Sequence, residues 1–220
     1  QDMVSILSNL PYGNIGLIVF ARKDIAEEAI SMNFTQFRSQ YRKYELTWTP
    51  TEALRLALWL AYRAVPETFG KQIDILKASR QVLEECLELL WGKKLGKRDS
   101  REAVTARWII AALSDFTGEL QARDIVRFLK YATQTYKDAT IVHYDRYIMP
   151  KEIRRAIPQC SNDKYSEIKS EMKEIYQILK KFEDMKDGEK QLPLMLEQLS
   201  LTGEEIAKLQ GQGYLSAVDQ

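Results

Sequence analysis

Residues 49–64 read TPTEALRLALWLAYRA, and this stretch sets the class of fold. Pro50 marks a helix start, because proline is favoured at the first helical position, where its missing N–H group would have no partner in any case. The run from Ala53 to Ala64 is rich in apolar residues and contains neither glycine nor proline. The pattern therefore predicts a helix that begins near Pro50 and continues through Ala64.

More helices are expected on both sides of this one. Residues 24–41, DIAEEAISMNFTQFRSQY, are amphipathic and begin with Asp24, a residue type that caps helix N-termini. Residues 44–48 favour an extended segment. Further helices are predicted at about residues 72–91, 101–114, 121–136 and 164–182. The glycines and prolines expected to separate these elements are Pro66, Gly70, Gly92, Gly96, Gly118, Pro150 and Pro158.

One segment near the N-terminus favours a strand instead. Residues 15–20, IGLIVF, form a short apolar run bounded by PYGN and RKD, which is typical of a buried parallel strand. A single buried strand is not stable alone. Either its partners lie elsewhere in a longer protein, or the segment is a helix. Because the chain opens with QDMVSILSNL rather than Met, we expect a piece of a longer protein.

The last 60 residues have a pattern of their own. Residues 192–199, LPLMLEQL, predict a short helix. Thr202 and Glu205 form a capping-box signature for a second helix, which should stop at a glycine pair before an extended YLSAV, residues 214–218. Helix, turn, helix and strand in this order are the minimal pattern of a winged-helix domain. Residues 161–220 carry 8 Lys and 12 Asp or Glu, and this acidic balance favours a protein partner over DNA.

Composition excludes several classes of function. The net charge is +1, and no apolar run is long enough to span a bilayer, so no membrane partner is expected. Cys86 and Cys160 suggest no disulfide framework, which favours a reducing, cytoplasmic setting. The single histidine, His143, lacks neighbours at metal-ligand spacing, so no metal site is predicted. No catalytic residue is predicted either, because GxSxG, HExxH, GxGxxG and the phosphate loop GxxxxGK[ST] are all missing.

The order of short motifs suggests a family. FARKDI (20–25) is followed by LTW, LWG, ARWIIAALSD and QARDIVRFL (121–129). This order resembles the C-terminal half of a bacterial P-loop ATPase of the AAA+/STAND kind. The resemblance implies a mainly α fold: a helical lid-type bundle with one short N-terminal strand, followed by a small winged-helix-like C-terminal domain. Its domains would be a remnant of the ATPase core at residues 1–45, a lid at 46–160 and the winged-helix-like domain at 161–220.

The resemblance also implies nucleotide-sensing residues. Arg22, with Asp24 nearby, matches the sensor-1 position after the strand, and Arg123 matches the sensor-2 position at a lid-helix start. A guanidinium suits this role because it is always charged and binds two oxygens at once. The lysine and carboxylates that bind nucleotide in the family have no counterpart here. ATP and Mg²⁺ are therefore expected only in an intact parent, with its ATPase core as partner, and this chain alone should bind no cofactor.

Two other interpretations remain open from the residues. Arg22 would pair with Asp24 or Glu28, and Arg123 would cover apolar surface, in a helical protein-interaction module without a nucleotide role. Alternatively, the loop GKKLGKRDSRE, residues 92–102, would contact nucleic-acid phosphates. The basic residues of that candidate contact are Lys93, Lys94, Lys97 and Arg98.

Overall fold

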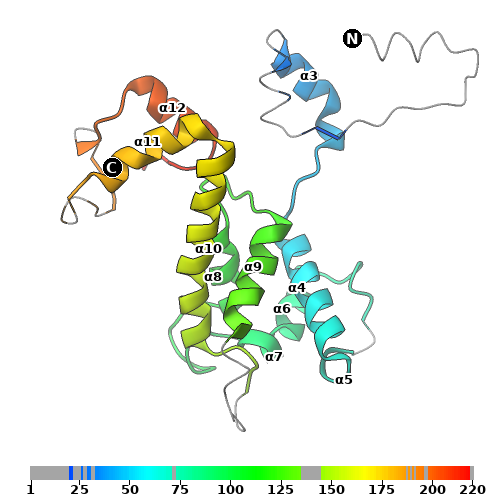
Figure 1. The fold of residues 1–220 in the computed structure, drawn as a ribbon. Coiled ribbons are helices and arrows are strands. Elements are labelled where there is room, and N and C mark those ends of the chain that lie inside the picture. The colour runs from blue at the N-terminus through cyan, green and yellow to red at the C-terminus, as the bar shows by residue number, and fades with distance from the viewer. Residues whose placement is uncertain are drawn as a thin grey trace, which may run out of the picture. The chain divides into compact units, whose positions relative to one another are not determined.

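The computed structural model describes residues 20–21, 26, 29–30, 33–70, 73–134, 145–186, 188, 190, 192–195 and 198–218. These residues are mainly helical, as predicted (Figure 1). The chain divides into two compact units, residues 1–46 and 47–220. The strand predicted at residues 15–20, except Phe20, lies outside the described residues, and so do Arg22, Asp24 and His143.

The first unit contains helix α3 (Phe34–Tyr41) and the 3-10 turn η1 (Arg42–Tyr44). The continuous helix predicted over residues 24–41 is wrong, because Ile30 is not helical and Asn33 has a φ of 63°. Asparagine tolerates this left-handed conformation better than most residues, so it interrupts the helix at low cost. None of the residues of α3 is buried.

Helix α4 (Pro50–Ala64) confirms the helix predicted from residues 49–64. It begins with a capping box: the Thr49 backbone N–H donates to the Glu52 carboxylate at 2.8 Å, and the Glu52 N–H donates to the Thr49 hydroxyl at 3.3 Å. One stripe of the helix is buried. Its members are Ala53, Leu54, Ala57, Leu58 and Ala61.

The first hydrophobic core forms around this stripe. It is built by α4, α5 (Pro66–Phe69), α6 (Arg80–Cys86), α7 (Glu88–Trp91), α8 (Thr105–Leu113), α9 (Ala122–Thr133) and the start of α10 (Pro150–Glu171). The single helix predicted at 72–91 is wrong in part, because residues 73–79 are not helical. Ser79 caps α6 and Leu87 separates it from α7. Within the described parts of the chain, β pairing is limited to the isolated bridges Trp48–Leu120 and Lys94–Val104.

Helix α10 is longer than the sequence indicated and starts at Pro150, not near residue 164. Pro158 was expected to separate two helices, but it lies inside α10. Proline removes the hydrogen bond to the carbonyl of Arg154, but both residues are exposed, so water can take the place of that bond. The helix ends at Glu171, and α11 (Lys173–Glu183) follows after Met172.

A second, smaller core lies beyond the middle of α10. The buried residues are Ile168 of α10, Ile175 and Ile178 of α11, and Leu209 of α12 (Gly203–Gly211). Thr202 and Glu205 form the predicted capping box of α12. The short helix predicted at 192–199 is wrong over residues 192–195, which are not helical, and residues 196–197 lie outside the described residues. Residues 214–218 belong to no strand, so the described part of the tail lacks the predicted wing.

We expect Thr49→Ala to lower the free energy of unfolding by about 1 kcal/mol, because the first turn of α4 loses its cap. Thr51→Ala is the matched control, since Thr51 lies in the same turn but outside the capping box. Chemical denaturation monitored by circular dichroism measures both variants. Equal losses for the two would contradict a role of the cap in holding α4.

Candidate functional site

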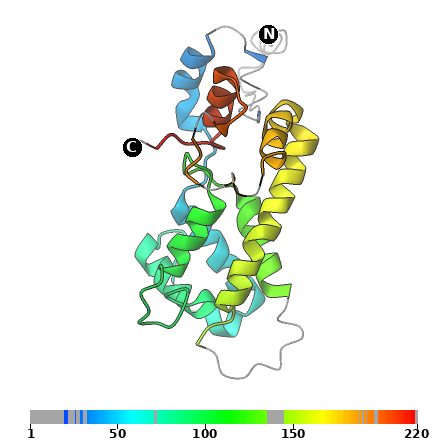
Figure 2. The same cartoon turned by 90° about the vertical axis from the view of Figure 1, so that its left-hand side faces the viewer.

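Arg123 lies in the first turn of α9, at the helix start that the sequence predicted. Its side chain is about half exposed, and its Nη1 donates to Glu167 Oε1 on α10 at 2.9 Å. Helices α9 and α10 run side by side, as Figures 1 and 2 show from two directions. Arg123 is therefore an arginine at a helix N-terminus with an anionic partner from a neighbouring helix.

A second arginine binds the same carboxylate. Arg127 Nη1 donates to Glu167 Oε2 at 3.0 Å, and Arg127 Nη2 makes a closer contact with Oε1. Only 20% of the Arg127 side chain is exposed. The hydrogen bonds from Arg127, followed by those from Arg123, hold the pKa of Glu167 below its usual range. The same bond to Glu167 raises the pKa of Arg127.

Further charged groups extend this contact along α9 and α10. Asp124 is buried, accepts the Gln121 backbone N–H at 3.2 Å and lies 3.7 Å from Lys164 Nζ. Asp163 accepts the Tyr131 hydroxyl at 2.6 Å. We call the ionic set the α9–α10 charge cluster; its members are Arg123, Asp124, Arg127, Asp163, Lys164 and Glu167. The three basic and three acidic groups balance, which lets so many charges lie together.

Nucleophilic chemistry is not supported at this cluster. Burial raises the pKa of the adjacent Cys160 thiol to about 11, and the nearby carboxylates of Asp124 and Asp163 act in the same direction. The thiol therefore stays protonated at neutral pH, and the thiolate is the reactive form.

Within the residues that the structure describes, no three His, Cys, Asp or Glu side chains gather to hold a metal ion.

The basic loop at residues 92–102 is built around a residue that the sequence did not single out. Arg146 is buried, and its guanidinium donates to the backbone carbonyls of Lys94 at 2.7 Å and Gly96 at 3.1 Å. Asp145 accepts from the same guanidinium at 2.8 Å. This buried donor organises the loop from within through bonds to the loop's backbone carbonyls.

The four basic residues of the loop differ in their surroundings. Lys93, Lys97 and Arg98 are exposed, whereas Lys94 is half-buried. Arg98 lies 3.4 Å from Glu88, and acidic Glu102 is paired with Arg154 at 2.8 Å. The loop surface is thus mixed in charge, and the nucleic-acid contact stays a prediction.

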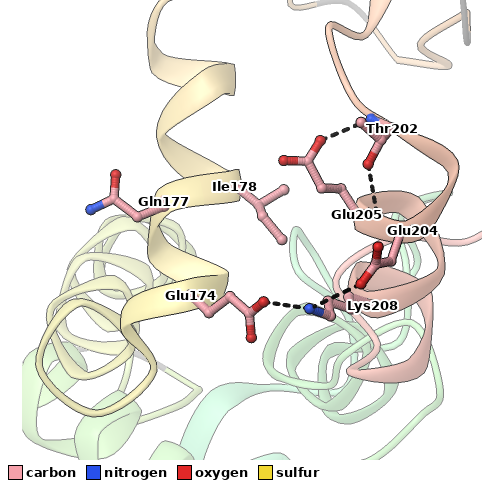
Figure 3. Close-up of a pocket in the computed structure, with 7 residues that line it drawn as sticks. All are labelled: Glu174, Gln177, Ile178, Thr202, Glu204, Glu205 and Lys208. Atoms are coloured by element: carbon pink, nitrogen blue, oxygen red, sulfur yellow. Dashed lines mark hydrogen bonds and ion pairs between the residues drawn. The ribbon is translucent and has the colours of Figure 1, made fainter.

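A hollow lies between α11 and α12 (Figure 3). Lys208 contacts Glu174 and lies 3.5 Å from Glu204. The Glu205 carboxylate accepts from the Thr202 N–H at 2.8 Å and from Lys181 at 2.7 Å. The hollow is therefore acidic and spanned by its own ion pairs, which hold the two helices together and disfavour an anionic ligand.

The sequence led to Arg123 but missed Arg127, Glu167 and Arg146. The four-residue spacing of Arg123 and Arg127 was a usable signal, because it places both on one helix face. Glu167 and Arg146 carried no such signal, since the arginines that bind Glu167 and the backbone carbonyls that accept from Arg146 lie 40 to 55 positions away.

Comparisons with known proteins match no family model, no curated protein and no solved structure. None of the helices in the described parts of the chain combines the length and the apolar character needed to cross a membrane. The candidate site therefore rests on its own geometry.

The lowered pKa of Glu167 makes stability depend on pH. A carboxylate whose pKa is lower in the folded state stabilises the fold above its unfolded pKa, and that contribution is lost as pH falls through the folded value. We expect the free energy of unfolding to fall less steeply in Glu167→Gln than in wild type as pH drops below about 4. Glu119→Gln, an exposed carboxylate outside the cluster, is the control and should keep the wild-type slope. Urea unfolding between pH 2 and pH 7 measures this, and identical slopes for Glu167→Gln and wild type would count against it.

A substitution at Gly92 tests whether the Arg146 guanidinium stabilises the fold. Gly92 has φ 79° and ψ 156°, and a Cβ there would lie 2.1 Å from Arg146 Nη1. Gly118 also has positive φ, 81°, but a Cβ there meets nothing within 4 Å. We expect both Ala variants to be destabilised by about 1–3 kcal/mol for the backbone conformation, with a further loss only in Gly92→Ala. Thermal melts that show equal losses would mean that the Arg146 contact contributes little.

Proposed function

We propose that this chain is the regulatory portion of a P-loop ATPase and follows the nucleotide-binding core in the same polypeptide. Residues 46–160 would form a helical lid over the nucleotide, and residues 161–220 would form an output domain. Arg123 would be the lid arginine that contacts the terminal phosphate of ATP. Arg22, with Asp24 nearby, would contact the same phosphate from the side of the nucleotide-binding core.

The observation that carries the proposal is the situation of Arg123. It lies in the first turn of α9, its side chain is half exposed, and its partner is an anion. The N–H groups of a helix N-terminus also favour negative charge. An arginine so placed can neutralise the charge that builds up on a phosphoryl group during transfer, when a matching phosphate is brought to it.

The chain's own residues would hold and orient that arginine. The buried face of α9, with Ile125 and Phe128 in the first core, fixes the helix that carries it. ATP and Mg²⁺ would be bound by the core, whose phosphate loop supplies the backbone N–H groups and lysine that this chain lacks. This chain would contribute the positive charge of Arg123, and closure of the rigid helical lid would bring that guanidinium to the phosphate.

The separate second core supports an output domain. Its buried residues belong to α10, α11 and α12, and its local charge is acidic, which suits a protein partner better than a nucleic acid. Because the described tail has no paired strand, we propose a small helical output domain; a full winged helix would require a wing.

The test is ATP turnover by the full-length polypeptide. We expect Arg123→Ala to lower kcat on the order of 100-fold, the scale seen when one preorganised donor to a transition state is removed. Arg154→Ala is a matched control, because both arginines are 52% exposed and each donates to one glutamate, at 2.9 Å and 2.8 Å. The control should keep wild-type turnover. Unchanged turnover in a folded Arg123→Ala variant would remove the sensor role and favour a helical interaction module.

A further inference from the structure

Arg123 and Arg127 together already form an occupied anion site. Three guanidinium N–H groups from one face of α9 converge on the two oxygens of Glu167. A carboxylate presents two oxygens much as one edge of a phosphate does, and arginine binds both in the same forked geometry. The present occupant of a site suited to phosphate is therefore a side chain of this same protein.

The two arginines differ in how firmly they are held. Arg127 is 20% exposed, binds both oxygens of Glu167 and has Asp124 and Asp163 each 3.8 Å away. Arg123 is 52% exposed, and the one ion pair found for it among the described residues is with Glu167 Oε1. Arg127 therefore anchors the carboxylate, whereas Arg123 can exchange its partner at low cost, since an exposed ion pair is worth about 1 kcal/mol or less.

We propose that Glu167 is a built-in competitor for nucleotide phosphate, which holds Arg123 when no nucleotide is bound and yields it when a phosphate arrives. This inference rests on the proposed function, because it assumes that the phosphate reaching Arg123 belongs to ATP. When Arg123 turns to the phosphate, Arg127 still neutralises Glu167, so no buried charge is left without a partner.

The position of Glu167 on α10 connects the exchange of partners by Arg123 with the second core. It precedes Ile168, which is buried in the second core with Ile175, Ile178 and Leu209. Helix α10 is continuous from Ile153 and Ala156 in the first core to Ile168 in the second. Loss of the Arg123 bond would therefore loosen the hold of α9 on α10 where α10 enters the second core (Figure 1).

The test compares affinities of the full-length polypeptide for a non-hydrolysable ATP analogue, measured by calorimetry. We expect Glu167→Gln to bind the analogue about two- to fivefold more tightly, the scale of an exposed ion pair. The gain should vanish when Arg123→Ala is added, because the competitor acts only through Arg123. Asp163→Asn is the matched control: it removes the same charge from the same helix but contacts Arg127 and Tyr131 instead of Arg123, so its affinity should match wild type.

The outcomes separate this inference from the function on which it rests. If Arg123→Ala weakens binding but Glu167→Gln leaves it unchanged, the sensor role stands and the competitor role is overturned. If Glu167→Gln and Asp163→Asn tighten binding equally, the effect is general electrostatics, and the competitor role is again overturned. If neither Arg123→Ala nor Glu167→Gln changes the affinity, Arg123 does not meet the nucleotide, and the proposed function itself fails. Circular dichroism of each variant confirms folding before comparison.

Discussion

The packing of α9 against α10 is the contact on which the rest of this structure depends. Ile125 and Phe128 of α9 and Ile153 of α10 are almost fully buried in the first core. Burying one such side chain is worth about 1.5–3 kcal/mol, whereas an exposed ion pair is worth about 1 kcal/mol at most. Apolar burial therefore contributes most to holding the two helices together, and the charge cluster lies beside it. Under the proposal above, Arg123 would therefore change partner without loss of the fold.

The sequence predicted the helices whose signals are local. Pro50 and the apolar run after it led to α4, and Thr202 with Glu205 led to the cap of α12. Predictions failed where tertiary context outweighs a local rule. Pro158 lies inside α10, where both it and Arg154, whose carbonyl loses its helical hydrogen bond, are exposed, and Asn33 interrupts a pattern that looks continuous in sequence. The predicted tail helix failed over residues 192–195 because apolar composition alone does not specify helical backbone.

The residues of the candidate site also divide into those that the local sequence could predict and those that it could not. The place of Arg123 at a helix start could be predicted, because a helix start is encoded by neighbouring residues, whereas its sensor role was implied only by the family resemblance and stays a prediction. Glu167 could not, because nothing in EIKSEMKEI distinguishes the one glutamate that meets two arginines from the glutamates that face solvent. Arg146 could not be predicted either, because its role is to donate to backbone carbonyls that carry no side-chain signature. Residues that meet only through the fold cannot be identified as partners until the fold is known.

The central claim is that Arg123 serves a phosphate bound elsewhere in the same polypeptide. The most direct measurement is the sequence of the reading frame upstream of Gln1. A GxxxxGK[ST] motif, followed by an apolar strand that ends in aspartate, is the expected result, because it would supply the phosphate loop and the Mg²⁺ ligand that this chain lacks. A reading frame that starts near Gln1, or an upstream region without these motifs, would contradict the claim and leave a helical interaction protein as the better description.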